Sequence, residues 1–190
     1  MTVSIALCTG VLLEGSLQVL AEAGITKIDR STLGRRLLVE KDGIRVVLVR
    51  PADVAAYVDF GAVDLGIVGK DQLWENPGSH YELVDLGFGA CRLVMAVPEE
   101  SELDGAEAWP PVLRVATKYP RATAAFFAAS GRAADLVGLH GSVEPAPPVG
   151  PADAVVGLTP PGPTVPRNHP PVTAETASPP RPPAAHRAHP

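Results

Sequence analysis

The sequence predicts an α/β protein of two lobes with a proline-rich C-terminal tail. Short apolar runs rich in β-branched residues alternate with helix-like segments along most of the chain. The chain has 190 residues, 46% of them hydrophobic, which is enough to bury one large domain or two small lobes. Fifteen of its 21 prolines lie at or after Pro145. We expect the lobes at residues 1–88 and 89–158, and the tail at 159–190.

The first lobe begins with a strand and a helix. VSIAL, residues 3–7, is typical of a buried strand, and Leu13, Leu17 and Leu20 then recur with helical spacing before a stop at Gly24. The remaining elements of this lobe are two strands around a Lys-Asp-Gly turn, a helix opened by a proline, and one more strand. Their sequences are RLLVE, IRVVLVR, PADVAAYVDF and AVDLGIVG.

The second lobe repeats the alternation of strands and helices. Its strand-like runs are CRLVMAVPE, LRVATKYP and ADLVGLHG, and its helix-like run is RATAAFFAASG. From Pro160 onward the chain is expected to be extended or disordered. Each later proline disfavours a helix interior by roughly 3 kcal/mol, so we expect no regular structure beyond Thr164.

Composition narrows the class of function. The formal net charge is -5, so the chain has no basic footprint for nucleic acid, and no apolar run approaches the roughly 20 residues of a membrane helix. Cys8 and Cys91 lie in apolar runs and fit reduced, buried thiols better than a disulfide or a metal site. We therefore expect a cytoplasmic protein that binds neither nucleic acid nor membrane.

Candidate binding residues follow the predicted strands, because ligands of open α/β sheets bind beyond the carboxyl ends of the strands. Glycines there, Gly10 among them, are more often turn formers than ligand contacts. For the charged residues two interpretations stay open. Arg50 could bind a ligand or form a structural ion pair, Asp71 could accept a ligand hydrogen bond or cap a helix, and Lys118 could bind phosphate or be a solvated surface charge.

No catalytic group stands out from spacing alone. His140 is better explained as an incidental polar residue than as a base, no nucleophile–base pair is recognisable, and no His/Cys cluster indicates zinc. Small residues, hydroxyls and a few charges recur after the strands, as suits a phosphorylated or nucleotide-like ligand.

Four segments follow one another along the chain: LVRPADVAAYVDFGAVDLGIVGKD, YELVDLGFGACRLVMAVP, VATKYPRATAAFF and LHGSVEPAPPVGPADAVV. In this order they resemble the catalytic subunit of ATP phosphoribosyltransferase, the first enzyme of histidine biosynthesis. The likeness runs from about Val3 to Val156. It implies a two-lobed fold like that of type II periplasmic binding proteins, with the substrate site between the lobes.

The resemblance also implies a reaction. The family joins N1 of the ATP adenine to C1 of phosphoribosyl pyrophosphate and releases pyrophosphate, with Mg²⁺ present. The chain is expected to be the short form, a homo-oligomer that also assembles with a regulatory subunit resembling histidyl-tRNA synthetase. On this reading Gly10, Arg50, Asp71 and Lys118 would bind ATP, and Glu144, Thr159, Gly162 and Thr164 would bind phosphoribosyl pyrophosphate.

The phosphoribosyl pyrophosphate loop of the family keeps its spacing here but not all of its residues. Glu144, Gly150, Ala152, Val155, Gly162 and Thr164 match the family pattern, whereas Gly157 replaces Asp, Pro161 replaces Ser or Thr, and Val165 replaces Leu or Met. Proline has no N–H to donate to a phosphate. Thr9 and Val11 stand where the family commonly has Lys and Arg.

These departures leave two interpretations. The leading one is an ATP phosphoribosyltransferase, with either full or weakened activity. The alternative is a non-catalytic, nucleotide-binding relative with a damaged phosphoribosyl pyrophosphate loop. A short nucleotide-binding module that recruits a partner through its tail has little support, because the tail has no repeated PxxP spacing.

Overall fold

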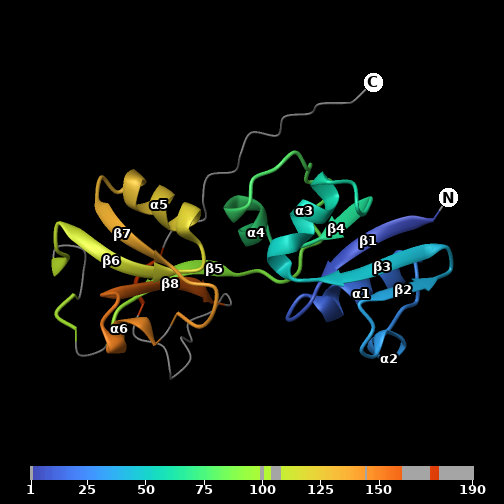
Figure 1. Cartoon of the computed structure of the whole chain (residues 1–190), viewed down its shortest axis with the longest axis horizontal. Coiled ribbons are helices and arrows are strands. Elements are labelled where there is room, and N and C mark those ends of the chain that lie inside the picture. Colours follow the sequence, from blue (N-terminus) through green and yellow to red (C-terminus); the bar gives the residue numbers. More distant parts are fainter. Residues whose placement is uncertain (1, 99–100, 104–107, 144, 160–171, 176–190) are drawn as a thin grey trace. The chain divides into compact units, whose positions relative to one another are not determined.

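The computed structural model describes residues 2–98, 101–103, 108–143, 145–159 and 172–175. The chain divides into two compact units, Met1–Ala90 and Cys91–Pro190, each with its own sheet (Figure 1). The boundary lies two residues after the position expected from the sequence. Among the described residues, no helix has the length and apolar character needed to cross a membrane.

The first unit is built on a four-stranded sheet of order β2-β3-β1-β4. Strands β1, β3 and β4 are parallel, and β2 runs antiparallel to β3. The elements are β1 (Val3–Cys8), α1 (Leu13–Glu22), α2 (Arg30–Leu33), β2 (Leu38–Lys41), β3 (Ile44–Val49), the 3-10 helix η1 (Pro51–Asp53), α3 (Val54–Asp59), β4 (Leu65–Ile67) and α4 (Lys70–Glu75).

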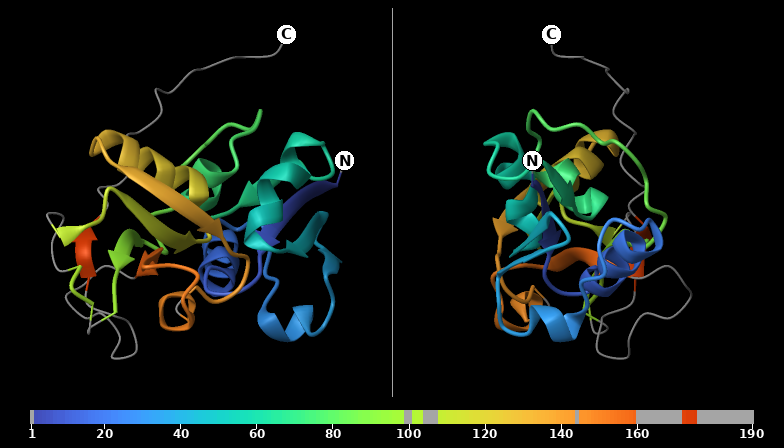
Figure 2. Two further views of the ribbon diagram at one scale, coloured as in Figure 1. Left: turned by 60° about the vertical axis from the view of Figure 1, so that its left-hand side comes forward. Right: turned by 90° about the vertical axis from the view of Figure 1, so that its right-hand side faces the viewer.

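Alternation along β1 divides the core of this unit between the two faces of the sheet. Leu13, Leu17 and Leu20 of α1 pack with Ile5 and Leu7, as their helical spacing predicts. On the other face, the intervening residues of β1 pack against the beginning of α3. This second cluster consists of Ala6, Cys8, Val49, Val54 and Val63. Helices therefore cover both faces, as Figure 2 shows for α1 and α3.

The second unit is built on a five-stranded sheet of order β7-β6-β8-β5-β9. Strands β6, β7 and β8 are parallel, and β5 runs antiparallel to both β8 and β9. The elements are β5 (Arg92–Ala96), β6 (Val112–Thr117), α5 (Pro120–Ala129), β7 (Ala133–Gly138), α6 (Ala146–Val149), β8 (Ala154–Thr159) and β9 (Val172–Glu175).

Helices α5 and α6 lie on opposite faces of this second sheet (Figures 1 and 2). Phe127 of α5 packs with Met95, Val115 and Val156 on one face. Ala146 of α6 packs in a separate cluster that includes Val155 on the other face. This division fixes which residues of β5, β6 and β8 share a face.

Two expectations from the sequence are wrong. Regular structure was not expected beyond Thr164, yet residues Val172–Glu175 form β9 on the edge of the second sheet. These four residues, VTAE, contain no proline, so each can take part in the strand pairing. Cys8 is buried as expected, whereas Cys91 is exposed because it precedes β5 and lies outside the sheet. Residues 160–171 and 176–190 lie outside the described residues.

Candidate functional site

One candidate edge lies in the first unit, where the carboxyl ends of β1, β3 and β4 come together because these strands are parallel. Cys8 pairs with Val49, and the Thr9 N–H donates to the Val49 carbonyl at 2.9 Å, which brings Thr9 beside Arg50. Gly10 has a φ of 99°, a left-handed conformation that glycine adopts without strain. The chain can therefore turn sharply between β1 and α1.

Arg50 is exposed at the end of β3, directly before Pro51 opens η1. Within the described part of the chain it has no ion-pair partner. The structural ion pair considered for Arg50 is thus absent among these residues. Its guanidinium remains available to an anionic ligand at this edge.

Asp71 lies in the first turn of α4, at the same edge. The helix-cap interpretation of Asp71 is wrong, because Gly69 occupies the cap position and Asp71 lies two residues later. The Asp71 carboxylate accepts a hydrogen bond from Gln72 Nε2 at 2.7 Å. Burial raises the pKa of the Cys8 thiol, and the negative charge of Asp71 raises it further, which places Asp71 near the end of β1.

Lys70 differs from Arg50 because two carboxylates already hold it. Its Nζ lies 2.8 Å from Asp85 and 3.0 Å from Glu82, both in the segment that leads to the second unit. Hydrogen bonds to Asp85 and then to Glu82 raise the pKa of the Lys70 ammonium. Arg50 is therefore the cation of this edge that a ligand can reach without displacing an ion pair.

Two uncharged residues lie between β1 and α1, at positions where the resemblance led us to expect cations. Val11 is 96% exposed, two residues before α1 begins, so its side chain faces solvent. Thr9 lies beside Arg50. Neither position supplies a positive charge to this edge.

A second candidate edge lies in the second unit, where the parallel strands β6, β7 and β8 end. Lys118 follows β6 and is exposed, and Thr159 is the last residue of β8 and is buried. Thr117 is also buried, and its hydroxyl accepts hydrogen bonds from Tyr119 N–H and Thr123 Oγ1. These bonds hold the turn from β6 into α5, and so fix where Lys118 leaves the sheet.

The structure groups the predicted site residues by unit. Gly10, Arg50 and Asp71 lie at the edge of the first sheet, and Lys118 and Thr159 lie at the edge of the second. Lys118 was assigned with the ATP residues, but it shares an edge with Thr159 of the phosphoribosyl group. Glu144, Pro161, Gly162 and Thr164 lie outside the described residues. His140 follows β7 and is exposed.

The sequence analysis missed Arg92. It considered residues after each strand, whereas β5 is antiparallel to β8 and so brings its first residue to the carboxyl edge. Arg92 lies directly opposite Thr159 in the register, and its Nε atom is buried. The sequence shows that a cation begins the apolar run of β5. Only the antiparallel pairing of β5 shows that this cation, Arg92, lies at the carboxyl edge of the sheet.

An ion pair at the opposite edge positions the start of β8. Arg114 of β6 donates from Nη2 and Nε to the two carboxylate oxygens of Asp153, at 2.6 and 3.2 Å, and from Nη1 to the Gly150 carbonyl at 3.3 Å. Gly150 ends α6 with a φ of 94°. Hydrogen bonds from Arg114 lower the pKa of the Asp153 carboxyl. Gly150, Ala152 and β8 are therefore held in one arrangement.

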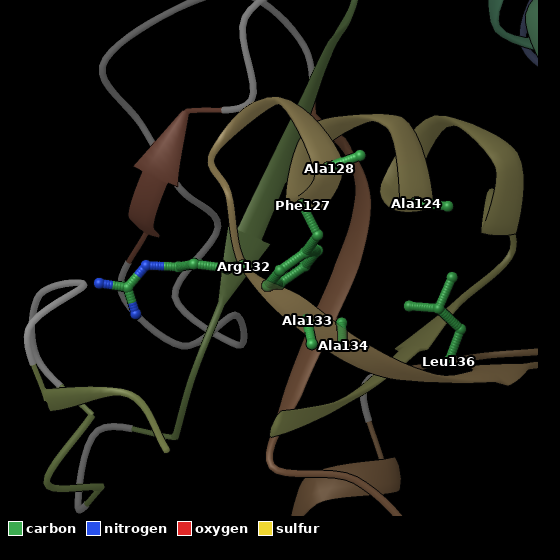
Figure 3. Close-up of a pocket in the computed structure, with 7 residues that line it drawn as sticks. All are labelled: Ala124, Phe127, Ala128, Arg132, Ala133, Ala134 and Leu136. Carbon is green, nitrogen blue, oxygen red and sulfur yellow. The ribbon is translucent and has the colours of Figure 1, made fainter. Parts of the chain in front are cut away.

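A groove between α5 and β7 has a mostly apolar lining. Figure 3 shows it lined by small and apolar side chains, with the Arg132 side chain extending away from them. The guanidinium carbon of Arg132 lies 5.2 Å from the centroid of the Trp109 ring. Arg132 therefore stacks on the core, and we do not assign this groove to the site.

Small residues and cations at the carboxyl edges of open α/β sheets are typical of proteins that bind anionic ligands there. Comparison with known proteins gives the family. Residues 50–175 match the family model described as HisG: ATP phosphoribosyltransferase. The chain belongs to the ATP phosphoribosyltransferase family.

Its relatives agree over most of the chain. It is 45% identical to an ATP phosphoribosyltransferase of Rubrobacter xylanophilus, over 86% of this chain and 77% of the relative. It is 42% identical to one of Moorella thermoacetica, over 87% and 75%. Among solved structures, it is similar to the ATP phosphoribosyl transferase (HisG:HisZ) complex from Thermotoga maritima, with a TM-score of 0.73 and 29% identity over 91% of this chain and 82% of that one.

Proposed function

We propose that this chain catalyses the reaction of its family, the first step of histidine biosynthesis. The phosphoribosyl group of phosphoribosyl pyrophosphate is transferred to N1 of the ATP adenine. The C1–O bond to pyrophosphate breaks, the C1–N1 bond forms, and pyrophosphate leaves. The observation that carries the proposal is the family match over residues 50–175 together with 45% identity to a named enzyme.

The first-unit edge is the proposed ATP side. Arg50 would pair with the polyphosphate because its guanidinium is exposed and has no ion pair within the described residues. Gly10 would let the backbone approach the ligand, and Asp71 would accept a hydrogen bond from the nucleoside. Lys70 is not assigned a role, because Glu82 and Asp85 hold it.

The second-unit edge is the proposed phosphoribosyl side, with Thr159 at the end of β8 and Glu144, Gly162 and Thr164 from the adjoining sequence. The displacement passes through positive charge at the sugar carbon, so orientation and stabilisation of the leaving pyrophosphate matter more than a dedicated nucleophile. Lys118 would contribute to that stabilisation, and its place at the same sheet edge as Thr159 supports moving it from the ATP group.

Mg²⁺ is proposed to arrive with the substrate phosphates. The described residues bring no three His, Cys, Asp or Glu side chains together as a metal cage. Mg²⁺ in phosphate-transferring sites is commonly held by phosphates and one or two carboxylates, so this edge suits an ion bound through its ligand. Asp71 is the carboxylate of the first-unit edge that such an ion would meet.

The proposed assembly is the short form with a regulatory subunit similar to histidyl-tRNA synthetase, in addition to a homo-oligomer of the chain itself. The similar Thermotoga maritima structure is a HisG:HisZ complex, which supports the regulatory partner. Two further predictions are an arrangement of the lobes like that of type II periplasmic binding proteins and a cytoplasmic location. The two separate α/β sheets support the predicted arrangement.

A direct assay tests the function. Purified chain, alone and with a histidyl-tRNA-synthetase-like subunit, is mixed with ATP, Mg²⁺ and phosphoribosyl pyrophosphate, and phosphoribosyl-ATP is followed by absorbance. We expect product in the mixture with the subunit, dependent on both substrates. The Arg50→Gln variant tests the ATP side, with Arg45→Gln as its matched control. ATP binding without product in either mixture would favour the non-catalytic, nucleotide-binding relative, for which the uncharged Thr9 and Val11 argue.

A further inference from the structure

We propose that Lys70 is a positioning residue for the carboxyl edge of the first sheet, and that it acts through residues 78–89, a segment we call the strap. The inference rests on the proposed function, in which Lys70 binds no ligand and Asp71 accepts a hydrogen bond from ATP. Lys70 lies directly before Asp71 in the first turn of α4. Its ion pairs hold the strap, and the strap in turn holds the elements that present Asp71.

The strap contains no helix or strand, so its course depends on side-chain contacts with the rest of the first unit. At the first contact, His80 Nδ1 lies 3.2 Å from both carboxylate oxygens of Asp59, the last residue of α3. These side chains are 13% and 21% exposed, so the contact is largely shielded from water. A Cβ at Gly78 would overlap the Asp59 carboxylate, so the chain passes close to it. The strap, green in Figure 1, is thus anchored beside α3.

The second contact is made by Lys70. Its Nζ donates to Asp85 at 2.8 Å and lies 3.0 Å from Glu82. The Asp85 carboxylate also accepts from the Gly87 N–H at 2.9 Å, which restrains the backbone just before Phe88. A single surface ion pair contributes little, whereas a cation shared by two carboxylates of one segment restrains that segment at two points.

The third contact joins the end of the strap to the turn between β1 and α1. A Cβ at Gly15 would lie 2.6 Å from the Phe88 ring, and a Cβ at Gly89 would overlap the Leu12 side chain. Leu12 Cδ1 also lies 3.6 Å from the Cβ position of Gly69, the cap residue of α4. One leucine therefore packs against the strap and against the start of α4. Because close packing transmits displacement, a shift of the strap reaches both.

These contacts determine where the Asp71 carboxylate lies. One of its oxygens accepts from Gln72 Nε2 at 2.7 Å, and a Cβ at Gly69 would overlap the other. The carboxylate thus lies against the cap residue that Leu12 contacts. A binding group works only when it is held close to its productive position. Loosening the strap should therefore weaken ATP binding although Lys70 itself makes no contact with the ligand.

The competing explanation is that Lys70 leaves its partners and binds a phosphate directly. The two explanations predict opposite effects when the charges of Glu82 and Asp85 are removed together. If Lys70 is a direct contact, the double variant frees the cation and strengthens ATP binding. If Lys70 is a positioning residue, the same variant releases the strap and weakens ATP binding.

Calorimetric titration of the purified full-length chain with ATP and Mg²⁺ tests the proposal, with phosphoribosyl pyrophosphate as the second ligand. Lys70→Met and the double variant Glu82→Gln/Asp85→Asn should each weaken ATP binding by about tenfold. Affinity for phosphoribosyl pyrophosphate should stay within about twofold, because a role confined to the first unit leaves the second edge unchanged. Lys70→Arg keeps the charge and should bind ATP nearly as the parent does.

Arg45→Gln is the matched control, because Arg45 is an exposed cation of the same unit, paired with Glu40, and its loss changes the net charge as Lys70→Met does. It should leave both affinities unchanged. Hydrogen exchange of the free protein is the second readout. In Lys70→Met, peptides from the strap and from residues 9–15 should exchange faster by about tenfold, whereas those of β6 and α5 should not change.

Stronger ATP binding in the Glu82→Gln/Asp85→Asn variant would overturn the proposal, by making Lys70 a direct contact. Unchanged ATP affinity in Lys70→Met would overturn it as well, whatever the exchange rates. If the parent chain binds no ATP, the ATP side of the proposed function fails, and exchange alone decides about Lys70. Faster exchange in both the strap and residues 9–15 of Lys70→Met would then support its positioning role, and unchanged exchange would overturn it.

Discussion

Arg114 and Asp153 join the start of β6 to the residue before β8 through both side chain and backbone. The Arg114 N–H and guanidinium donate to the Asp153 carboxylate, and the Asp153 N–H donates to the Arg114 carbonyl at 2.8 Å. This pair holds the amino end of the strand whose other end carries Thr159. It links the local stability of the second unit to the geometry of the edge that we propose as the phosphoribosyl side.

Asp153→Asn should destabilise the protein by about 1 kcal/mol, because a neutral amide replaces the carboxylate that accepts from three Arg114 donors. Chemical denaturation followed by circular dichroism measures the change. Arg45→Gln, which removes a longer and more exposed pair at 3.5 Å, should change stability little. Equal effects of the two variants would contradict the role given to Asp153.

Stability should fall in acid, and Asp153 should contribute to that fall. Its folded-state pKa is lowered by Arg114, as that of Asp64 is lowered by Ser4. A lowered carboxyl pKa adds stability that is complete above the unfolded aspartate value of about 3.9 and is lost as the pH falls through the folded value. Unfolding free energies measured from pH 7 to 3 should therefore drop less steeply for Asp153→Asn than for the parent.

Gly15→Ala should destabilise the protein although alanine favours helices over glycine by about 1 kcal/mol. A Cβ at Gly15 of α1 would lie 2.6 Å from the Phe88 ring, and crowding of this kind costs roughly 1–3 kcal/mol. Thermal unfolding of Gly15→Ala, Phe88→Ala and the double variant measures the change in stability. In a Phe88→Ala background the same change should become neutral or stabilising; a loss that persists there would show that Phe88 is not the cause.

Arg50→Gln should raise the KM for ATP by about tenfold with a smaller effect on kcat, because a ground-state phosphate contact is removed. Initial rates at varied ATP and saturating phosphoribosyl pyrophosphate provide the measurement, with Arg45→Gln as the control. An unchanged KM for ATP would remove Arg50 from the ATP side.

The two thiols should react at different rates with a disulfide reagent such as dithionitrobenzoate. Cys91 is exposed, whereas Cys8 is buried with its pKa raised by that burial, and thiolate is the reactive form. We expect one fast thiol in the native protein and a second after unfolding, with Cys91→Ser losing the fast one. A fast reaction in Cys91→Ser would mean that Cys8 is accessible.

The periodicity of apolar residues predicted most of the helices and strands, because each such pattern lies within one short segment of the chain. The spacing of Leu13, Leu17 and Leu20 predicted α1, and the run IRVVLV predicted β3, since packing on one helix face or in a parallel sheet needs those patterns. The strand at Leu65–Ile67 is shorter than its apolar run, and β9 was missed because its four residues lie between prolines. Short edge strands depend on the partner strand and leave little signal of their own.

The candidate site was predictable only in part. Arg50 and Lys118 were found because residues after parallel strands meet at one edge, a rule that needs no coordinates. Arg92 was missed because an antiparallel strand brings its first residue to that edge, and sequence does not state pairing direction. Asp71 could be a cap or an acceptor from its sequence alone, and the backbone decided that Gly69 is the cap.

The sequence by itself determined the α/β class, the resemblance to the family, and the absence of charge at Thr9, Val11 and Gly157, because these follow from residue identity and local pattern. The tertiary structure decided which residues act together. It placed Lys118 at the same sheet edge as Thr159 and Arg92, paired Lys70 with Glu82 and Asp85, and left open space at Gly157. Such relations depend on strand order, register and side-chain contacts between distant residues, which no local pattern specifies.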